Sequence, residues 1–240
     1  MIVYGLNPVL EALRGGHVVR LATSARKGPR HREIAALAGA RGLAVEHADE
    51  AALREWTRGA AHQGVVAWTR DAQRPTLEDV VRTGGTAPLL LVLDGIEDPH
   101  NVGAILRSAD AAGVSGVVRQ TRRAAALGGA AAKASAGAVV HVAIVDVVNI
   151  ARALEDLGAL GVWSVGLAAD GAQVYDEVDF TQPTAIVVGA EGTGLRRLVR
   201  DRCDIVARIP MQGHVGSLNV SVAAAVVLFE ALRQRRVRAR

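Results

Sequence analysis

The second half of the chain alternates short runs of apolar residues with stretches in which apolar residues recur every three or four positions. The runs fall at residues 89–93, 117–119, 139–144, 162–166, 185–188 and 205–209. The periodic stretches fall at residues 102–112, 147–157, 195–202 and 220–235. Continuous apolar strands that alternate with helices are typical of a mostly parallel sheet covered on both faces. We therefore predict an α/β domain over residues 88–240.

The first 70 residues show the same alternation over a shorter distance. Strands are predicted at 18–23, 43–47 and 64–69, and helices at 8–14, 32–41 and from 50 to about 58. Asn7 followed by Pro8, and later Asp49, are typical helix starts. This pattern predicts a small N-terminal α/β domain over residues 1–70.

Residues 71–87 contain Pro75 and the pair Gly84 and Gly85, which favour a linker, with a short capped helix at 76–81. The alanine-rich segment 124–138 has no pattern that assigns it to a helix or a strand.

Composition narrows the class of protein. No apolar run reaches the roughly 18 residues that a membrane-spanning helix needs, and the N-terminus has no signal-peptide pattern. Cys203 is the single cysteine, which excludes an internal disulfide and argues against a metal cluster. We therefore expect a cytoplasmic protein without a membrane anchor and without a metal.

The positive charge is concentrated at the N-terminus. Residues 1–70 hold 10 basic and 6 acidic groups, a net charge of +4, whereas residues 71–240 hold 18 of each. The densest group of basic residues is Arg26, Lys27, Arg30 and Arg32. Arginine pairs well with phosphate, so this patch is a candidate RNA contact, although an ordinary solvated surface has the same charge pattern.

Three loops rich in glycine, asparagine and serine follow apolar runs in the second half and lead into helices. They lie within residues 91–107, 186–195 and 209–221. In α/β sheets such strand ends build ligand sites. No G-x-G-x-x-G follows the first strand of either domain, the P-loop pattern is absent, and glycines 189, 192 and 194 have the wrong order for a dinucleotide fingerprint. The loops therefore predict one ligand site, whose main-chain loops differ from those of the common nucleotide-binding folds.

The polar residues of these loops resemble, in order and spacing, the three motifs of the SpoU family of ribose 2′-O-methyltransferases, within the SPOUT superfamily: Asn101 with Arg107, then Glu191, then Ser217 with Asn219. The resemblance covers residues 88–235, and residues 4–13 also resemble the start of this family's 23S rRNA guanosine enzymes. It implies a C-terminal trefoil knot, bound S-adenosylmethionine, a homodimer, and a ribosomal-protein-like RNA-binding domain in front.

The resemblance also implies roles for single residues. Main-chain groups around Gly189, Ile209 and Leu218 would contact the cofactor. Arg107 has the role of base in family accounts. Because a guanidinium is a poor base, we expect it instead to bind the adjacent phosphate and to stabilise the emerging alkoxide. Its neighbours Ile105, Leu106 and Ala109 place it where a buried arginine requires an anionic partner.

The remaining motif residues each have a structural alternative. Asn101 is either a helix N-cap or a site residue. Glu191 either forms the turn or accepts a hydrogen bond from substrate or from Asn101. Ser217 and Asn219 either cap the last helix or orient the ribose.

The resulting hypothesis is S-adenosylmethionine-dependent 2′-O-methylation of a guanosine in 23S rRNA by a homodimer. The alternatives are a tRNA or another rRNA nucleotide as substrate, or a non-catalytic RNA-binding or ribosome-assembly factor. The chemistry requires mainly alignment of the ribose hydroxyl with an activated methyl group and handling of one proton, so no metal is needed.

Overall fold

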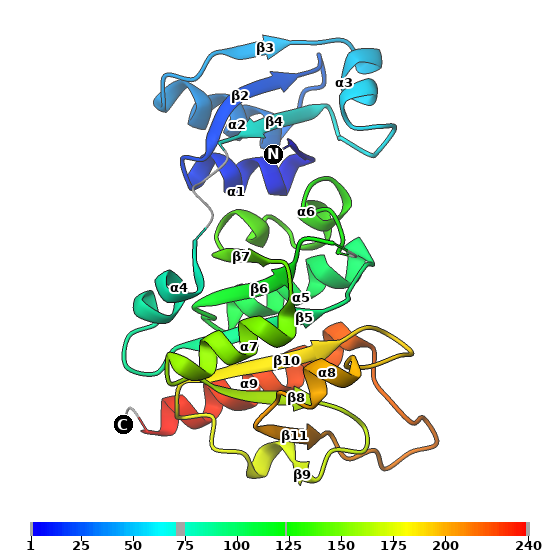
Figure 1. Cartoon of the computed structure of the whole chain (residues 1–240). Helices are drawn as coiled ribbons and strands as arrows, with labels where there is room; N and C mark the ends of the chain where they lie inside the picture. Colours follow the sequence, from blue (N-terminus) through cyan, green and yellow to red (C-terminus); the bar gives the residue numbers. More distant parts are fainter. Residues whose placement is uncertain (1, 71–74, 123, 239–240) are drawn as a thin grey trace.

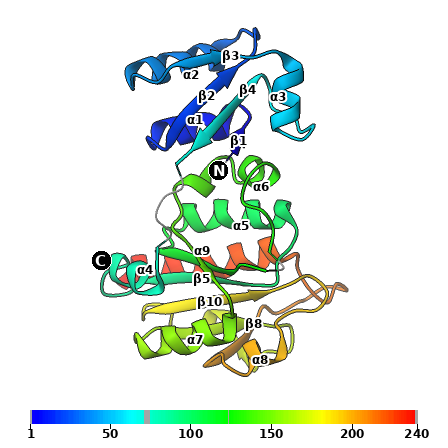
Figure 2. The ribbon, with the colours of Figure 1, turned by 45° about the horizontal axis from the view of Figure 1, so that its top comes forward.

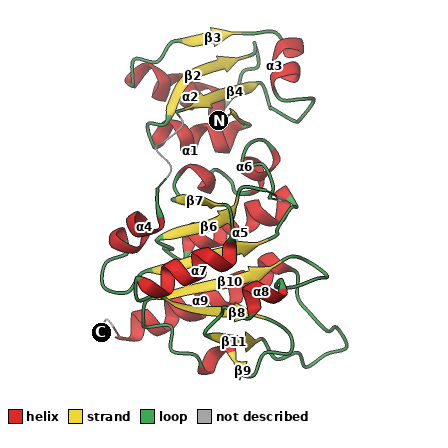
Figure 3. Cartoon of the chain, in the orientation of Figure 1, coloured by secondary structure: helices red, strands yellow, loops and turns green. Residues whose placement is uncertain are grey.

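Two β-sheets organise the chain, one above the other in Figure 1. The computed structural model describes residues 2–70, 75–122 and 124–238. Within these ranges, a four-stranded sheet forms from the first 69 residues and a seven-stranded sheet from residues 89–208. Figure 3 shows strands flanked by helices in both parts, as expected for an α/β protein.

The N-terminal sheet has the strand order β1-β4-β2-β3. Its elements are β1 (Ile2–Tyr4), α1 (Leu6–Arg14), β2 (Val18–Thr23), α2 (Pro29–Ala40), β3 (Val45–His47), α3 (Glu50–Trp56) and β4 (Val65–Thr69). The Asp49 side chain accepts from the Ala52 amide and caps α3, as predicted. Strand β1 was not predicted, because three residues show no periodicity. It pairs antiparallel with β4.

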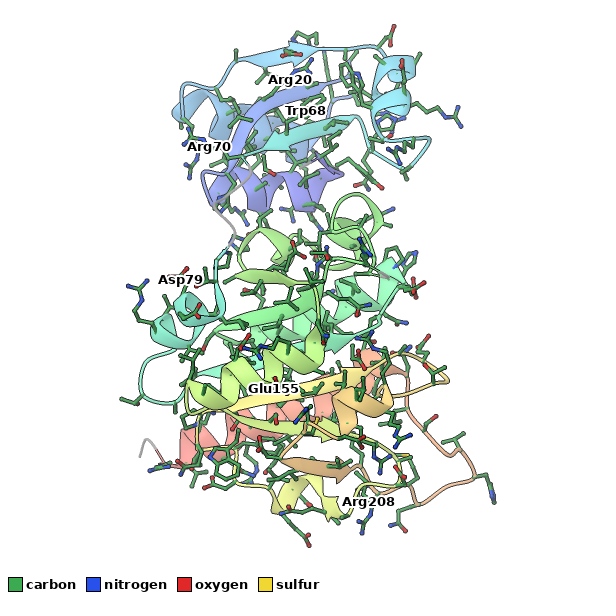
Figure 4. The ribbon with its side chains drawn as sticks, in the orientation of Figure 1. Arg20, Trp68, Arg70, Asp79, Glu155 and Arg208 are labelled. Atoms are coloured by element: carbon green, nitrogen blue, oxygen red, sulfur yellow. The ribbon has the colours of Figure 1, made fainter. Side chains whose placement is uncertain are left out.

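An aromatic cluster covers part of one face of this sheet. The Arg20 guanidinium lies 4.1 Å from the centre of the Trp68 ring and 5.3 Å from that of Trp56. Figure 4 shows Arg20 and Trp68 on neighbouring strands. Arg20 also pairs with Glu46 at 2.8 Å. These contacts attach α3 and the edge strand β3 to the centre of the sheet.

The C-terminal sheet has the strand order β7-β6-β5-β10-β8-β11-β9, and every pairing given for it is parallel. Its strands are β5 (Leu89–Asp94), β6 (Gly116–Gln120), β7 (Ile144–Val147), β8 (Trp163–Leu167), β9 (Gln173–Val174), β10 (Thr184–Gly189) and β11 (Ile205–Arg208). The helical elements are α5 (Pro99–Ala111), α6 (Ala130–Ala134), η1 (Ala138–Val140), α7 (Ile150–Ala159), η2 (Tyr175–Glu177), α8 (Arg197–Arg200) and α9 (Val220–Arg238). The mostly parallel sheet is thus confirmed.

Helices cover both faces of this sheet because its central strands are apolar on both sides. Leu91 and Leu93 of β5 face the core formed with α5 and α9. Leu90 and Val92 alternate with them and face the core formed with α7. In Figure 2, α5 and α9 lie on one side of the sheet and α7 and α8 on the other.

The strand predicted directly after the alanine-rich segment differs from the structure. The strand predicted at 139–144 begins only at Ile144, since residues 138–140 form the turn η1. The preceding helix α6 packs closely on α5. A Cβ at Gly103 would lie 2.4 Å from the Ala134 Cβ. Small side chains therefore serve close helix packing here, which periodicity alone does not reveal.

Part of the predicted linker packs on the C-terminal sheet. Helix α4 (Leu77–Thr83) begins at Thr76, which forms a capping box with Asp79. Figure 4 shows Asp79 on this helix. Leu77 and Val80 are buried in the core shared with α7. Residues 75–83 thus belong structurally to the C-terminal part, while residues 71–74 lie outside the described ranges.

Candidate functional site

One side chain joins the three motif loops. The Asn219 amide nitrogen donates to Asn101 Oδ1 at 3.1 Å and to Glu191 Oε1 at 2.5 Å. Its amide oxygen accepts from the backbone N–H and the hydroxyl of Ser221, at 2.9 and 2.6 Å. Asn219 therefore holds α5, the loop after β10 and the start of α9 together.

The structural alternatives for these residues are resolved in part. The N-cap of α5 is Asp98, whose side chain accepts from the His100 amide, so Asn101 lies in the first turn and is not the cap. Glu191 bonds to Asn219, which links it to Asn101 only indirectly. Asn219 does bond the first turn of α9, in addition to its two contacts across the site.

A pocket of about 480 Å³ opens beside this junction. It lies at the carboxyl ends of β5, β6 and β10, the edge at which parallel sheets place their ligands. Most of the residues that line it have polar side chains: they are Asp94, Gly95, Ile96, Glu97, Asp98, Asn101, Gln120, Ala190, Glu191, Thr193, Gly194 and Arg196.

A buried carboxylate anchors an arginine at the wall of this pocket. Asp94 is fully buried and accepts from the Arg196 backbone amide at 2.8 Å and from Arg196 Nε at 2.6 Å. Arg196 Nη2 donates to Gln120 Oε1 at 2.8 Å. A buried carboxylate requires such partners. Sequence reasoning missed this cluster, although Asp94, an acid that ends an apolar strand, was a usable signal.

Arg107 is exposed, in contrast to its predicted burial. Ile105, Leu106 and Ala109 are fully buried on the core side of α5, and Arg107 lies on the opposite side of the same helix turn. Within the described ranges, Arg107 makes no hydrogen bond or ion pair. Its guanidinium is therefore free to meet a ligand or a second copy of the chain.

The three predicted cofactor residues lie at or after strand ends on the same edge of the sheet. Gly189 ends β10, and a Cβ there would lie 2.2 Å from the Gly194 carbonyl carbon, so only glycine fits. Ile209 is half-buried after β11 and packs against the main core. Leu218 and Ser217 are exposed in the loop before α9, and Ser217 has no hydrogen-bond partner among the described residues.

The basic patch is only partly free. Arg26 forms two hydrogen bonds with Glu50, at 2.8 and 3.0 Å, and Arg30 lies 3.4 Å from Glu33. Lys27 and Arg32 are exposed and have no ion pair within the part of the chain described. The sequence pattern did not reveal that neighbouring glutamates neutralise half of this patch.

Cys203 is half-buried behind the site, and its thiol donates to the Val199 carbonyl at 3.3 Å. Burial, with help from the nearby carboxylates of Asp204 and Asp94, raises the pKa of this thiol to about 12. The thiol is therefore neutral near pH 7, as expected for a small core residue.

The described residues contain neither a membrane-spanning helix nor a metal centre. No helix in these ranges has both the length and the apolar character that a bilayer crossing needs. Nor do these ranges bring three or more His, Cys, Asp or Glu side chains into an arrangement that could hold a metal ion.

Comparison with known proteins identifies the family of the chain. Residues 88–229 match the SpoU rRNA Methylase family, and residues 2–75 match the family described as RNA 2′-O ribose methyltransferase substrate binding. The chain is 44% identical to the 23S rRNA (guanosine-2′-O-)-methyltransferase RlmB of Pseudomonas aeruginosa, over 97% of this chain and 96% of that one.

Solved structures show the same fold. The SpoU methyltransferase AviRb from Streptomyces viridochromogenes superposes with a TM-score of 0.82 at 28% identity, over 99% of this chain and 90% of AviRb. Its complex with the cofactor AdoMet superposes with a TM-score of 0.80 at 27% identity, over 99% and 91%. Family match, sequence identity and fold thus agree: the chain belongs to the SpoU rRNA methylase family.

Proposed function

We propose that this protein transfers a methyl group from S-adenosylmethionine to the ribose 2′-hydroxyl of a guanosine in 23S rRNA. The observation that carries the proposal is the Asn219 junction, which joins the three motif loops beside a pocket at the carboxyl ends of the strands. The RlmB relative, similar over nearly the whole length, supports the substrate.

The loops around Gly189 suit a cofactor held by main-chain groups. Gly189 allows backbone atoms of the loop to approach at van der Waals limits, and Ile209 and Leu218 add apolar surface next to backbone donors and acceptors. We assign the S-adenosylmethionine contacts to these three positions. When bound, the sulfonium supplies an activated methyl group, so the protein mainly has to align the acceptor.

The polar residues would align the ribose and stabilise the negative charge that develops on its 2′-oxygen. Asn219 holds Asn101 and Glu191 in fixed positions, and Ser217 beside it has a free hydroxyl for the ribose. Arg107 would bind the adjacent phosphate and stabilise the alkoxide that forms as the proton leaves. A permanently charged guanidinium suits electrostatic stabilisation better than proton abstraction.

The site is completed by a second copy of the chain in this proposal. On α9, the side chains of Val222, Val226 and Phe229 recur at intervals of four and three residues and so share one helix face. Val222 and Phe229 are 47% and 48% exposed. Such an apolar stripe fits a homodimer interface. Arg107 is exposed on α5, which packs beside α9, and would then face the second copy.

We further assign residues 1–70 as the RNA-binding domain, 71–87 as the connection, whose helix α4 packs on the following domain, and 88–240 as the SPOUT methyltransferase domain with its C-terminal trefoil knot. The match of residues 2–75 to a substrate-binding family supports the first assignment. Because ribosomal RNA is the substrate, the enzyme would act in the cytoplasm.

The test is to map 2′-O-methyl groups in rRNA from a deletion strain and after complementation. We expect one guanosine of 23S rRNA to lose its methyl group, and to regain it with the wild-type chain but not with Arg107→Ala. Loss of a methyl group from tRNA instead would reassign the substrate. Unchanged RNA together with no S-adenosylmethionine binding in calorimetry would favour a non-catalytic factor.

A further inference from the structure

We propose that the pocket lined by Asp94, Glu97 and Arg196 holds the guanine base of the target nucleotide. In this assignment Glu97 accepts from guanine N1–H and the N2 amino group, while Arg196 donates to guanine O6. The inference rests on the proposed function and adds the residues that choose the base.

Arg196 is a preoriented donor. Its backbone amide and Nε bond to the buried Asp94, and Nη2 bonds to Gln120. Nη1 has no protein partner within the described residues. The side chain is 49% exposed, so this nitrogen can meet a ligand while the rest of the guanidinium is fixed. A fixed donor loses little entropy when it binds.

Glu97 supplies the complementary acceptor. Three other carboxylates line the pocket, and each already has a partner: Asp94 bonds to Arg196, Asp98 caps α5, and Glu191 accepts from Asn219. Glu97 is exposed and makes no hydrogen bond or ion pair with any described residue. Its carboxylate is therefore available to a ligand in the pocket.

One donor and one carboxylate acceptor have the hydrogen-bonding polarity that the Watson–Crick edge of guanine requires, and the opposite of the polarity that adenine requires. Guanine presents one acceptor, O6, beside two donors, N1–H and the N2 amino group, and a carboxylate can accept from both donors at once. Adenine presents a donor at N6 and an acceptor at N1, which would face Arg196 and Glu97 with the wrong polarity. Polar groups that a bound base covers and leaves unpaired discriminate between ligands.

The position of the pocket fits this role. Asn101 and Glu191, both assigned to the ribose, line the same pocket as Glu97 and Arg196. Ile96 and Ala190 add apolar surface beside the polar groups, as a flat base requires. A base in the pocket would therefore keep its own ribose next to the catalytic residues.

The test compares guanosine with inosine, which lacks only the N2 amino group, at the mapped target position of a synthetic 23S rRNA fragment. We expect wild-type protein to methylate guanosine about tenfold or more faster than inosine, in kcat/KM, because one hydrogen bond to a charged group is lost. Glu97→Gln should lower kcat/KM for guanosine and bring the guanosine-to-inosine ratio close to one. S-adenosylmethionine affinity should stay unchanged.

Two further variants test whether the change in the guanosine-to-inosine ratio is specific to Glu97. Arg196→Lys keeps a cation beside Asp94 and should slow both substrates equally, since both carry O6. Glu78→Gln makes the same charge change on α4, away from the pocket, and should leave rates and ratio at wild-type values. A Glu97→Gln variant that retains the wild-type ratio would overturn the guanine pocket. If wild-type protein methylates no rRNA guanosine at all, the proposed function itself fails.

Discussion

Replacing Asn219 tests whether the junction of the motif loops serves the reaction or only the fold. The alanine variant loses the donors to Asn101 and Glu191 and the acceptor for Ser221. The cap contributes about 1 kcal/mol, and the bond to the buried Asn101 contributes about another 1 kcal/mol. We expect a loss of about 2 kcal/mol, which lowers Tm by roughly 4–8 °C for a chain of this size.

The aspartate variant separates the two roles. Asn219→Asp keeps an acceptor for Ser221 at the start of α9, where a negative charge is favourable. It replaces the amide donor by an oxygen that faces Asn101 Oδ1 and the Glu191 carboxylate. The aspartate variant thus keeps the cap but loses the bond to Asn101 and gains repulsion from Glu191, so we expect at least half of the alanine variant's Tm loss. Turnover should fall by about 10²-fold or more in both variants.

The assay pairs calorimetric unfolding with transfer of labelled methyl groups to rRNA. Asn149→Ala is the matched control, because Asn149 caps α7 through the Arg152 amide and lies outside the motif loops. This variant should lower Tm only by the amount that corresponds to one helix cap, about 1 kcal/mol, and should leave turnover unchanged. Near-wild-type turnover of Asn219→Asp would refute the view that the amide donor matters. Turnover that simply follows Tm across all three variants would refute it as well.

Four further predictions concern the cofactor loop, the RNA surface, the dimer and the thiol. Gly189→Ala should abolish S-adenosylmethionine binding in calorimetry, since its Cβ would lie 2.2 Å from backbone atoms; unchanged affinity would refute the assigned cradle. Changing Lys27 and Arg32 to glutamine should reduce the slope of log affinity for rRNA against log salt by about 0.7–0.9 for each phosphate that is no longer neutralised; an unchanged slope would exclude a role for these two side chains in RNA binding. Phe229→Glu should give a monomer in sedimentation, whereas we expect the wild-type protein to sediment as a dimer; a wild-type monomer would contradict the proposed interface. Cys203, whose pKa is raised to about 12, should stay protonated and react slowly with a thiol reagent at pH 8 until the protein unfolds; fast labelling of the folded protein would contradict its burial.

The sequence predicted features that depend on local pattern. Apolar runs such as 89–93 and 185–188 became central strands of the sheet, because a strand buried on both faces has to be apolar throughout. Asp49 and Thr76 capped their helices as expected. The way in which helices and strands pack against one another was not predictable from local pattern. Helical spacing did not show that Arg107 lies on the solvent side of α5.

The sequence indicated which motif residues lie near one another, but it did not indicate the hydrogen bonds that join them. The motifs identified Asn101, Glu191 and Asn219, yet no pattern indicated that Asn219 alone bridges the other two. The pair of Asp94 and Arg196 joins residues 102 positions apart, and Arg196 falls in an otherwise ordinary run of basic residues. A contact between residues so far apart in the chain produces no periodic pattern that a single sequence could reveal.

The strand order of the C-terminal sheet has a consequence for synthesis of the protein. The N-terminal sheet uses only residues 2–69, so it can be complete while the ribosome is still translating the rest. In contrast, β5 has to wait for β10, which pairs Leu89 with Thr184, and Asn101 has to wait for Asn219, 118 residues later. Such distant pairings form late during folding. A nascent chain would thus complete the proposed RNA-binding domain well before the motif loops meet. We therefore expect a product that ends before residue 219 to bind RNA without modifying it.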